Sequence, residues 1–202
     1  MKPKSYSRVV NSGEQAAIDR KSGMIVWFTG LSGAGKSTLA QSVERQLWNR
    51  KYRTFLLDGD RLRKDLCSDL GFGQADRQEN VRRAFVVARM MAEAGLICLV
   101  ALISPFRAGR LRARNAMPAG SFVEVFVNAP LSVCEKRDPK GLYRRARSGE
   151  LSDFTGISSP YEPPERPEVE IRSDVLTVEE STSVVLRAVE QRFRDTMSPP
   201  KD

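Results

Sequence analysis

The feature that most constrains this fold is a glycine-rich loop between an apolar run and a helical pattern. Residues 30–38 read GLSGAGKST and fit the phosphate-binding pattern G-x-x-x-x-G-K-[ST]. Residues 24–29 are apolar enough for a buried strand, and residues 37–50 repeat apolar positions at helical spacing. Strand, loop and helix in this order direct backbone N–H groups toward phosphate oxygens. The sequence therefore predicts a binding site for a nucleoside triphosphate.

Two side chains of this loop have direct roles in such a site. Lys36 supplies a mobile positive charge for the outer phosphates, and the hydroxyl of Ser37 can ligate Mg²⁺. The alternative is a glycine-rich turn that only starts a helix, and it is disfavoured because all four defining positions are filled and both flanks fit. The loop expected to hold the phosphates comprises Gly30, Leu31, Ser32, Gly33, Ala34, Gly35, Lys36, Ser37 and Thr38.

Alternation of apolar runs and helical patterns predicts an α/β fold. Strands are expected at 24–29, 54–57, 97–103 and 122–127, with a weaker one at 174–178. Helices are expected at about 37–50, 76–94, 107–117, 131–138 and 179–195. Runs that are apolar throughout are typical of strands covered on both faces, and the βαβ order favours parallel pairing. The expected architecture is a P-loop NTPase-type three-layer sandwich with a mostly parallel five-stranded sheet.

The remaining segments suggest how the chain is divided. We expect an N-terminal extension at 1–22, one domain at 23–197 and a tail at 198–202. Within the domain, the stretch that begins at about residue 139 is rich in glycine and proline and has little apolar periodicity. Long segments of this kind in compact domains are usually functional, and often they are lids. A lid is therefore expected at about 139–165.

Composition excludes several classes of function. The 202 residues include no histidine, so no histidine can act as a general base or metal ligand. The three cysteines, Cys67, Cys98 and Cys134, form neither a disulfide framework nor a C-x-x-C site, which fits a reducing cytoplasm. No apolar run approaches the roughly 20 residues that span a bilayer. We expect a cytoplasmic protein with no membrane partner.

The net charge of +8, from 33 Lys and Arg against 25 Asp and Glu, indicates anionic ligands. The basic residues are scattered through segments that follow strands, and they are not gathered in one tail. This distribution favours a pocket for small phosphorylated molecules over a nucleic-acid surface. For about half of these residues, an exposed and solvated position is explanation enough.

Two carboxylates follow the second expected strand. Asp58 and Asp60 flank a glycine there. Because ligands bind beyond the carboxyl ends of parallel strands, both groups are expected near the phosphate loop. A kinase needs one carboxylate to hold Mg²⁺ and another near the attacking hydroxyl. The alternative is a turn with a helix cap, and the neighbouring phosphate loop favours the functional interpretation.

The segment that opens the next helix carries several polar side chains. Asp76 with Glu79 predicts a capping box at the start of that helix. Capping leaves Arg77 and Asn80 unexplained, and their i, i+3 spacing places them on one face, where they could contact an anionic group and a base edge. Phe72 could stack on a base or pack in the core, and the sequence alone favours packing.

Ser104 follows the third expected strand and has two interpretations. Its hydroxyl could be phosphorylated transiently, or it could contact the substrate or cap the next helix. Phosphoryl transfer in kinases relies on positioning and charge stabilisation and needs no covalent step. A contact role is therefore favoured over a phosphoserine intermediate.

Taken in order, these segments resemble the adenylylsulfate (APS) kinase family. The resemblance extends from about residue 22 to residue 170, and the segments after the phosphate loop make it specific. They are Trp27 to Gly33 with the loop, Leu57-Asp58-Gly59-Asp60, Leu70-Gly71-Phe72, Asp76-Arg77, Glu79-Asn80, Arg82-Arg83, Ile103 to Arg107, Cys134-Glu135, Arg137 to Tyr143, Phe154 to Ile157 and Pro160-Tyr161-Glu162. The resemblance implies transfer of a phosphate from MgATP to the 3′-hydroxyl of adenosine 5′-phosphosulfate (APS). It also implies a homodimer and a sulfurylase as a partner.

The resemblance further implies roles for individual residues. The loop Gly30 to Thr38 would hold ATP, with Mg²⁺ at Ser37 and Asp58. The implied catalytic residues are Lys36, Asp58, Asp60 and Ser104. The implied APS-binding residues are Asp60, Arg63, Phe72, Arg77, Asn80, Ile103, Ser104, Lys140, Phe154 and Gly156. The adenine of APS would lie between the two phenylalanines of that set.

Some questions stay open at the level of sequence. Arg61 stands where the family commonly has asparagine, and its cation could face the substrate or the solvent. Another small P-loop kinase, acting on nucleosides, nucleotides or sugars, is the alternative enzyme. A nucleotide-dependent switch is the alternative of another class, and the chain lacks an N-K-x-D segment that would read guanine.

Overall fold

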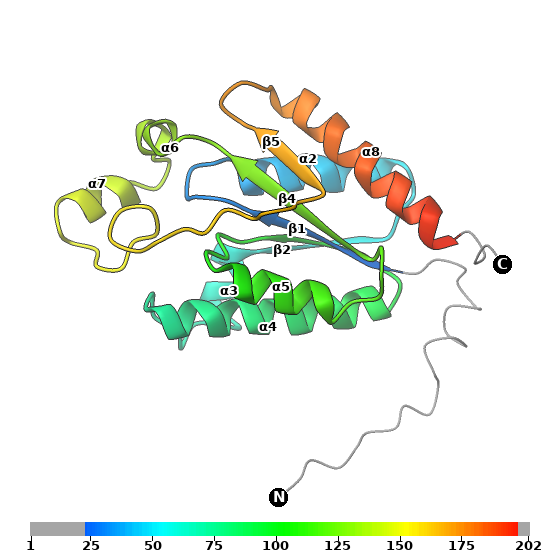
Figure 1. Cartoon of the computed structure of the whole chain (residues 1–202), viewed down its shortest axis with the longest axis horizontal. Coiled ribbons are helices and arrows are strands. Elements are labelled where there is room, and N and C mark those ends of the chain that lie inside the picture. The colour runs from blue at the N-terminus through cyan, green and yellow to red at the C-terminus, as the bar shows by residue number, and fades with distance from the viewer. Residues whose placement is uncertain (1–22, 198–202) are drawn as a thin grey trace, which may run out of the picture.

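A five-stranded parallel sheet separates two layers of helices (Figure 1). This computed structural model describes residues 23–197, so the expected extension at 1–22 and tail at 198–202 lie outside the described residues. The strands are β1 (Met24–Thr29), β2 (Thr54–Asp58), β3 (Ile97–Ala101), β4 (Phe122–Asn128) and β5 (Val169–Arg172). They lie in the order β2-β3-β1-β4-β5, and every neighbouring pair is parallel. The expected three-layer α/β fold is confirmed.

Different helices cover the two faces of the sheet. Helices α2 (Lys36–Asn49) and α8 (Val178–Met197) lie over one face, and α4 (Gln74–Glu93) and α5 (Arg107–Asn115) lie over the other (Figure 1). Alternate residues of β1 enter two separate cores. Val26 and Phe28 pack with residues of α2 and α8, whereas Ile25 and Trp27 pack with residues of α4. Burial on both faces explains why this strand is apolar throughout.

Three strand ends bring the sequence motifs together. Since β2, β3 and β1 are neighbours in the sheet, the segments that follow them leave the same edge side by side. The short helix α3 (Gly59–Lys64) begins directly after β2. Helices α6 (Leu131–Arg137) and α7 (Leu142–Arg147) project beyond this edge (Figure 1). The candidate site therefore forms at the carboxyl edge of the sheet.

Two strand predictions require correction. The weak strand expected at 174–178 is wrong, because the fifth strand lies at 169–172 and the chain turns at 173–175 before α8. In β5, buried Val169 and Ile171 alternate with exposed Glu170 and Arg172, so this edge strand has no continuous apolar run. β3 ends at 101 and not at 103, and the chain leaves the sheet there toward the site.

The start of α4 also differs from the prediction. Its N-cap is Gly73, so Asp76 lies inside the first turn. The carboxylate of Glu79 binds Arg82 and Arg83 and does not reach back to the helix start. The predicted capping box is therefore wrong. Asp76 still places a negative charge near the helix N-terminus, where the helix dipole favours it.

The segment expected to be a lid contains one helix that was not predicted. Helix α7 occupies 142–147, and residues 148–165 form a loop with an isolated bridge between Thr155 and Ser159. The helix was missed because it has only six residues, LYRRAR, and half of them are arginine. This length gives no apolar periodicity to detect.

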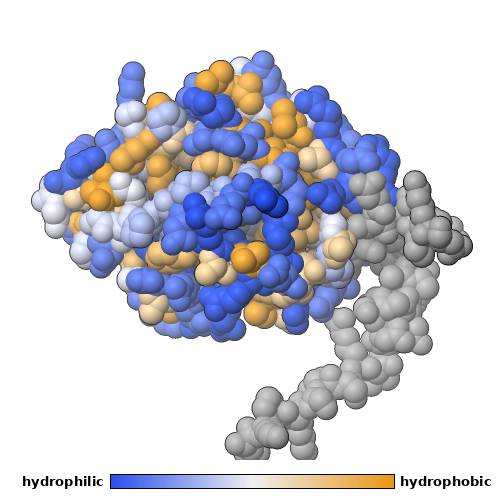
Figure 2. Space-filling model, viewed as in Figure 1, coloured by the Kyte–Doolittle hydropathy of each residue, from blue (hydrophilic) through white to orange (hydrophobic). Residues whose placement is uncertain are grey.

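The surface and the cysteines agree with the expectations from composition. Figure 2 shows hydrophilic residues over much of the visible face, with separate apolar patches between them. Cys67, Cys98 and Cys134 are buried free thiols, as expected for small core residues. Among the helices at 23–197, none has the length and hydropathy to cross a membrane.

Candidate active site

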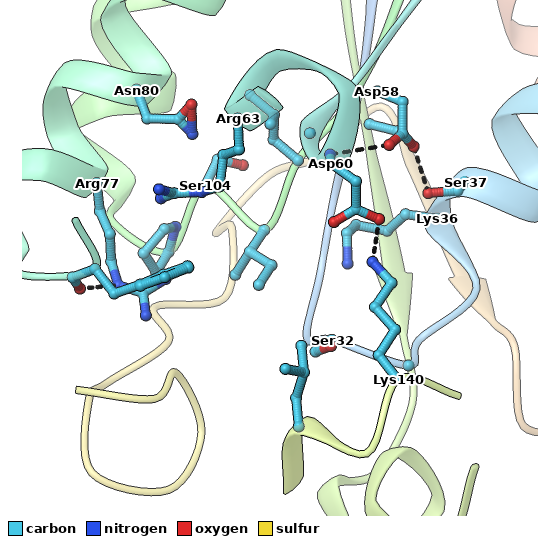
Figure 3. A pocket seen from close by; sticks show the side chains of 18 of the residues that line it. Ser32, Lys36, Ser37, Asp58, Asp60, Arg63, Arg77, Asn80, Ser104 and Lys140 are labelled. Carbon is cyan, nitrogen blue, oxygen red and sulfur yellow. Dashed lines mark hydrogen bonds and ion pairs between the residues drawn. The ribbon is translucent and has the colours of Figure 1, made fainter. Parts of the chain in front are cut away.

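A cavity of about 580 Å³ lies at the carboxyl edge of the sheet and collects most of the predicted site residues (Figure 3). The predicted residues that line it are Ser32, Gly33, Gly35, Lys36, Ser37, Thr38, Asp58, Asp60, Arg63, Phe72, Arg77, Asn80, Ile103, Ser104, Lys140 and Phe154. Phosphate-loop residues lie toward one end, and Arg77 and Asn80 lie toward the other (Figure 3). The size is typical of small-molecule sites. Val81, Leu102, Pro105, Pro139 and Leu142 also line the cavity and were not predicted.

Four predicted residues lie outside the lining of this cavity: Gly30, Leu31, Ala34 and Gly156. Gly156 adopts a φ of +93°, and a Cβ there would meet the side chain of Leu31 at 3.1 Å. A Cβ at Gly30 would lie 2.4 Å from the carbonyl oxygen of Val127. Both glycines thus permit close packing, the first between the lid and the phosphate loop and the second between that loop and β4.

Lys36 is almost completely buried at the base of the loop. Its side chain donates a hydrogen bond to the carbonyl of Leu31 at 2.7 Å. Burial is the largest influence on this ammonium and lowers its pKa from 10.5 to about 8. The carboxylates of Asp58 and Asp60 act in the opposite direction but do not outweigh burial, and bound phosphates would stabilise the ammonium further.

Three contacts from outside the loop hold the backbone of the phosphate loop. Tyr143 of α7 donates to the carbonyl of Ser32 at 3.0 Å. Arg137 donates to the carbonyl of Gly33 at 3.3 Å, and Ser173 donates to the carbonyl of Ala34 at 2.7 Å. Sequence reasoning missed these supports because the partners are more than 100 residues apart.

Asp58 caps a helix and also contacts the phosphate loop. One carboxylate oxygen caps α3 by accepting from the backbone N–H of Asp60 at 3.0 Å. The other accepts from the hydroxyl of Ser37 at 2.6 Å. A carboxylate and a hydroxyl so close together are hard oxygen ligands of the type Mg²⁺ prefers. Within residues 23–197 there is no cluster of three or more Asp, Glu, His or Cys suited to a metal, so the remaining ligands would be phosphates and water.

Asp60 and Lys140 form an ion pair across the mouth of the cavity (Figure 3). Asp60 comes from the start of α3, and Lys140 comes from the lid segment. Both side chains are about half exposed, with 60% and 49% of their surface accessible. The carboxylate is thus accessible to a substrate hydroxyl, and a cation of the lid lies beside it.

Phe72 is exposed, contrary to the packing interpretation. Its exposed fraction is 55%, and its ring lines the cavity. The guanidinium carbons of Arg63 and Arg77 lie 4.3 Å and 5.6 Å from the ring centroid. Both cations attract the ring by cation–π interaction. An aromatic surface supported in this way is suited to stacking on a base.

Arg77 is 6% exposed and connects two walls of the cavity. Its Nε donates to the carbonyl of Phe72 at 2.7 Å, and its Nη2 donates to the carbonyl of Asp153 at 2.6 Å. The next residue is Phe154, which packs edge-to-face on Tyr143 with centroids 5.0 Å apart. Burial lowers the pKa of Arg77 from its usual value. Arg77 therefore holds the backbone of both aromatic residues.

Asn80 has an acceptor without a partner. The residue is 7% exposed and lines the cavity beside Arg77, as its i, i+3 spacing predicts. Its Oδ1 has no hydrogen-bond partner within the described chain. A buried unsatisfied oxygen is costly unless a ligand or water donates to it. This atom is therefore a candidate acceptor for an exocyclic amine.

The hydroxyl of Ser104 takes part in a buried hydrogen-bond network. It accepts from Trp27 Nε1 at 3.0 Å and donates to Thr29 Oγ1 at 2.9 Å. Thr29 in turn donates to the carbonyl of Ile103 at 2.8 Å. Only 3% of Ser104 is exposed. The geometry gives this side chain a supporting role in the cavity wall.

Arg61 does not line the cavity. It lines a separate groove, of about 160 Å³, together with Phe55, Leu57, Leu66 and Met91. The residue is exposed and stands outside the lining of the candidate site.

Comparisons with known proteins are consistent with this geometry. A sequence model described as adenylylsulphate kinase matches residues 22–172. A protein named adenylyl-sulfate kinase from Vibrio parahaemolyticus is 50% identical over 187 residues, which cover 93% of this chain and 91% of that protein. The structure of the Mycobacterium tuberculosis APS kinase CysC in complex with AMPPNP and APS is similar, with a TM-score of 0.80 and 46% identity, and covers 84% of this chain and 99% of that chain. A hexameric APS kinase from Thiobacillus denitrificans has a TM-score of 0.63 and 34% identity, over 85% of this chain and 29% of that one.

Proposed function

The chain belongs to the adenylylsulfate kinase family, and from this premise we propose how its residues perform the reaction. The reaction transfers the γ-phosphate of ATP to the 3′-hydroxyl of APS and gives 3′-phosphoadenosine 5′-phosphosulfate. The observation that carries the assignment of roles is the shared cavity. Lys36 and Ser37 lie toward one end of it, Arg77 and Asn80 lie toward the other, and Asp60 lies between them (Figure 3).

The phosphate loop binds ATP. Backbone N–H groups of residues 30–38 surround the phosphates, and Lys36 moves its ammonium from the carbonyl of Leu31 to the outer phosphate oxygens. Ser37 and Asp58 would hold Mg²⁺, because both offer hard oxygen ligands and lie within hydrogen-bond distance of each other. The bound ion supplies positive charge against the charge of the transferring phosphate.

APS binds at the opposite end of the cavity. Its adenine lies between the exposed ring of Phe72 and Phe154, and its amine donates to the unpaired Oδ1 of Asn80. Arg63 and Lys140 supply positive charge for the phosphosulfate. Ile103 and the Ser104 backbone form the wall between the adenine and the phosphate loop. Arg77 supports the site through its carbonyl contacts, and Gly156 supports it by close packing.

Asp60 orients the 3′-hydroxyl and accepts its proton. The carboxylate is exposed toward the cavity, and the chain has no histidine to compete for this role. Ser104 gives its hydroxyl hydrogen to Thr29, so we propose direct transfer from ATP to APS without a phosphoserine.

We also propose a cytoplasmic homodimer supplied with APS by a sulfurylase. The buried free thiols at positions 67, 98 and 134 are compatible with a reducing compartment. Sedimentation analysis would establish the oligomeric state, with a mass near twice 22.6 kDa expected.

A coupled ADP-release assay with a panel of acceptors tests the function. APS should stimulate ADP release with MgATP, whereas adenosine, AMP and gluconate should not. Stimulation by one of these acceptors and not by APS would contradict the proposal and favour another small P-loop kinase.

A further inference from the structure

Arg110 of α5 is a buried cation that the roles above do not use. Only 2% of its side chain is exposed. Its Nε donates to the carboxylate of Glu124 at 2.7 Å, and its Nη2 donates to the carbonyl of Glu162 at 2.6 Å. Its Nη1 donates to the carbonyl of Ser104. Glu124 balances the buried charge, and the two carbonyls connect the guanidinium to the active site.

These two carbonyls belong to segments that meet only through tertiary contacts. Ser104 is part of the wall at 103–105, which lines the cavity. Glu162 lies at the end of the lid, eight residues after Phe154, and its backbone N–H donates to the carbonyl of Pro105 at 2.8 Å. The neighbouring Tyr161 bonds Thr29 Oγ1 at 3.0 Å, the same atom that accepts from Ser104. Arg110 therefore lies where the lid base and the cavity wall join.

The backbone of Ser104 requires such support. Its φ is +41°, a conformation that is unfavourable for a residue other than glycine. Strained backbone persists only where surrounding contacts hold it in place. Trp27 and Thr29 hold the side chain of Ser104, and Arg110 holds its carbonyl.

We propose that Arg110 is a positioning residue for APS binding. Its guanidinium fixes Ser104 and Glu162 relative to each other and thereby aligns the wall at 103–105 with Phe154 of the lid. The planar fork of arginine supplies donors in three directions from a single buried charge. Lysine would keep the charge opposite Glu124, but its single ammonium cannot serve three acceptors spread around a fork. This inference rests on the proposed assignment of APS to this end of the cavity.

The test is Arg110→Lys, with separate KM values measured for APS and ATP. The KM for APS should rise about tenfold, the effect of losing a hydrogen bond from a charged donor, and the KM for ATP should stay within about twofold. Arg114→Lys is the matched control. Arg114 lies one turn farther on α5 and bonds the carboxylates of Glu168 and Glu124, which lie outside the cavity lining. Equal effects of the two variants, or an unchanged KM for APS in Arg110→Lys, would overturn the inference.

A second variant serves if Arg110→Lys does not fold. Arg110→Met combined with Glu124→Gln removes both charges of the buried pair, a replacement that proteins often tolerate, and Arg114 keeps its bonds to Glu168. The same selective rise in the KM for APS is expected, and its absence in a folded double variant would overturn the inference. The wild-type protein in the same assay distinguishes failure of the proposed function from failure of the role of Arg110. Failure of the wild type to use APS would contradict the proposed function, whereas a null result beside an active wild type contradicts only the role of Arg110.

Discussion

Arg77 donates a hydrogen bond of 2.6 Å to the carbonyl of Asp153, which lies 76 residues later in the chain. The same guanidinium donates to the carbonyl of Phe72. One buried side chain thus sets the position of both phenylalanines proposed to enclose the adenine of APS. The sequence predicts that Arg77 contacts an anion, whereas in the structure its guanidinium bonds two backbone carbonyls of the site walls.

Arg77→Lys keeps the positive charge but should loosen the lid. A lysine cannot hold both carbonyls, so backbone amides at 153–158 should exchange hydrogen faster, and APS affinity should fall about tenfold. Hydrogen exchange by mass spectrometry and calorimetry measure the two effects. Arg82→Lys on the same helix is the control, because Arg82 is exposed and pairs with Glu79. Unchanged exchange at 153–158 in Arg77→Lys would refute the coupling.

Asp60→Asn should lower kcat by a factor of about 10² to 10⁴, the usual range for removal of a general base. The asparagine keeps the shape of the side chain, so ATP should still bind within about twofold of the wild type. Asp65→Asn is the control, since Asp65 is exposed and lies outside the cavity lining. Steady-state kinetics and ATP titration suffice, and retained turnover in Asp60→Asn would remove its assigned role.

Lys36 should take up a proton when MgATP binds in alkaline solution. Its pKa of about 8 results mainly from burial, and phosphates at the ammonium should raise this pKa. Binding at about pH 8.5 should therefore consume protons, and binding at pH 6.5 should consume none at this group. Calorimetry in two buffers of different ionisation enthalpy gives the number of protons taken up on binding. Lys36→Met should abolish the difference between buffers, and equal heats for the wild type at pH 8.5 would contradict the expectation.

The lowered pKa of Lys36 also predicts how the stability of the ligand-free protein changes with pH. Between pH 8 and 10.5 the unfolded chain binds more protons at this lysine than the folded chain does. The contribution of Lys36 to the free energy of unfolding should therefore increase with pH in this window and stay constant below it.

Ser104→Ala should retain turnover within about tenfold and lose stability. The substitution leaves the buried Trp27 N–H without its acceptor, which costs about 1–3 kcal/mol. Thermal unfolding and steady-state kinetics separate these effects. Complete loss of turnover with normal APS binding and a normal Tm would instead favour a phosphoserine intermediate.

The sequence predicted those parts of the site that depend on local pattern and on strand order. The phosphate loop is a contiguous motif, and Asp58 and Ser104 could be placed together because parallel strands end at one edge. β5 was misplaced because a four-residue edge strand with alternating burial gives little signal. The carbonyl contacts of Arg77 and Arg110 could not be predicted, because they depend on tertiary packing of segments far apart in sequence.

Gly33 has a consequence for engineering with this phosphate loop. A Cβ at this position would lie 2.9 Å from the carbonyl oxygen of Cys134 in α6, and the backbone there has a φ of +74°. The conformation of the loop therefore depends partly on packing against α6, which follows it by about 100 residues. Transplanting the nine residues with only their strand and helix into another scaffold would remove this contact with α6. A faithful graft has to carry α6 as well.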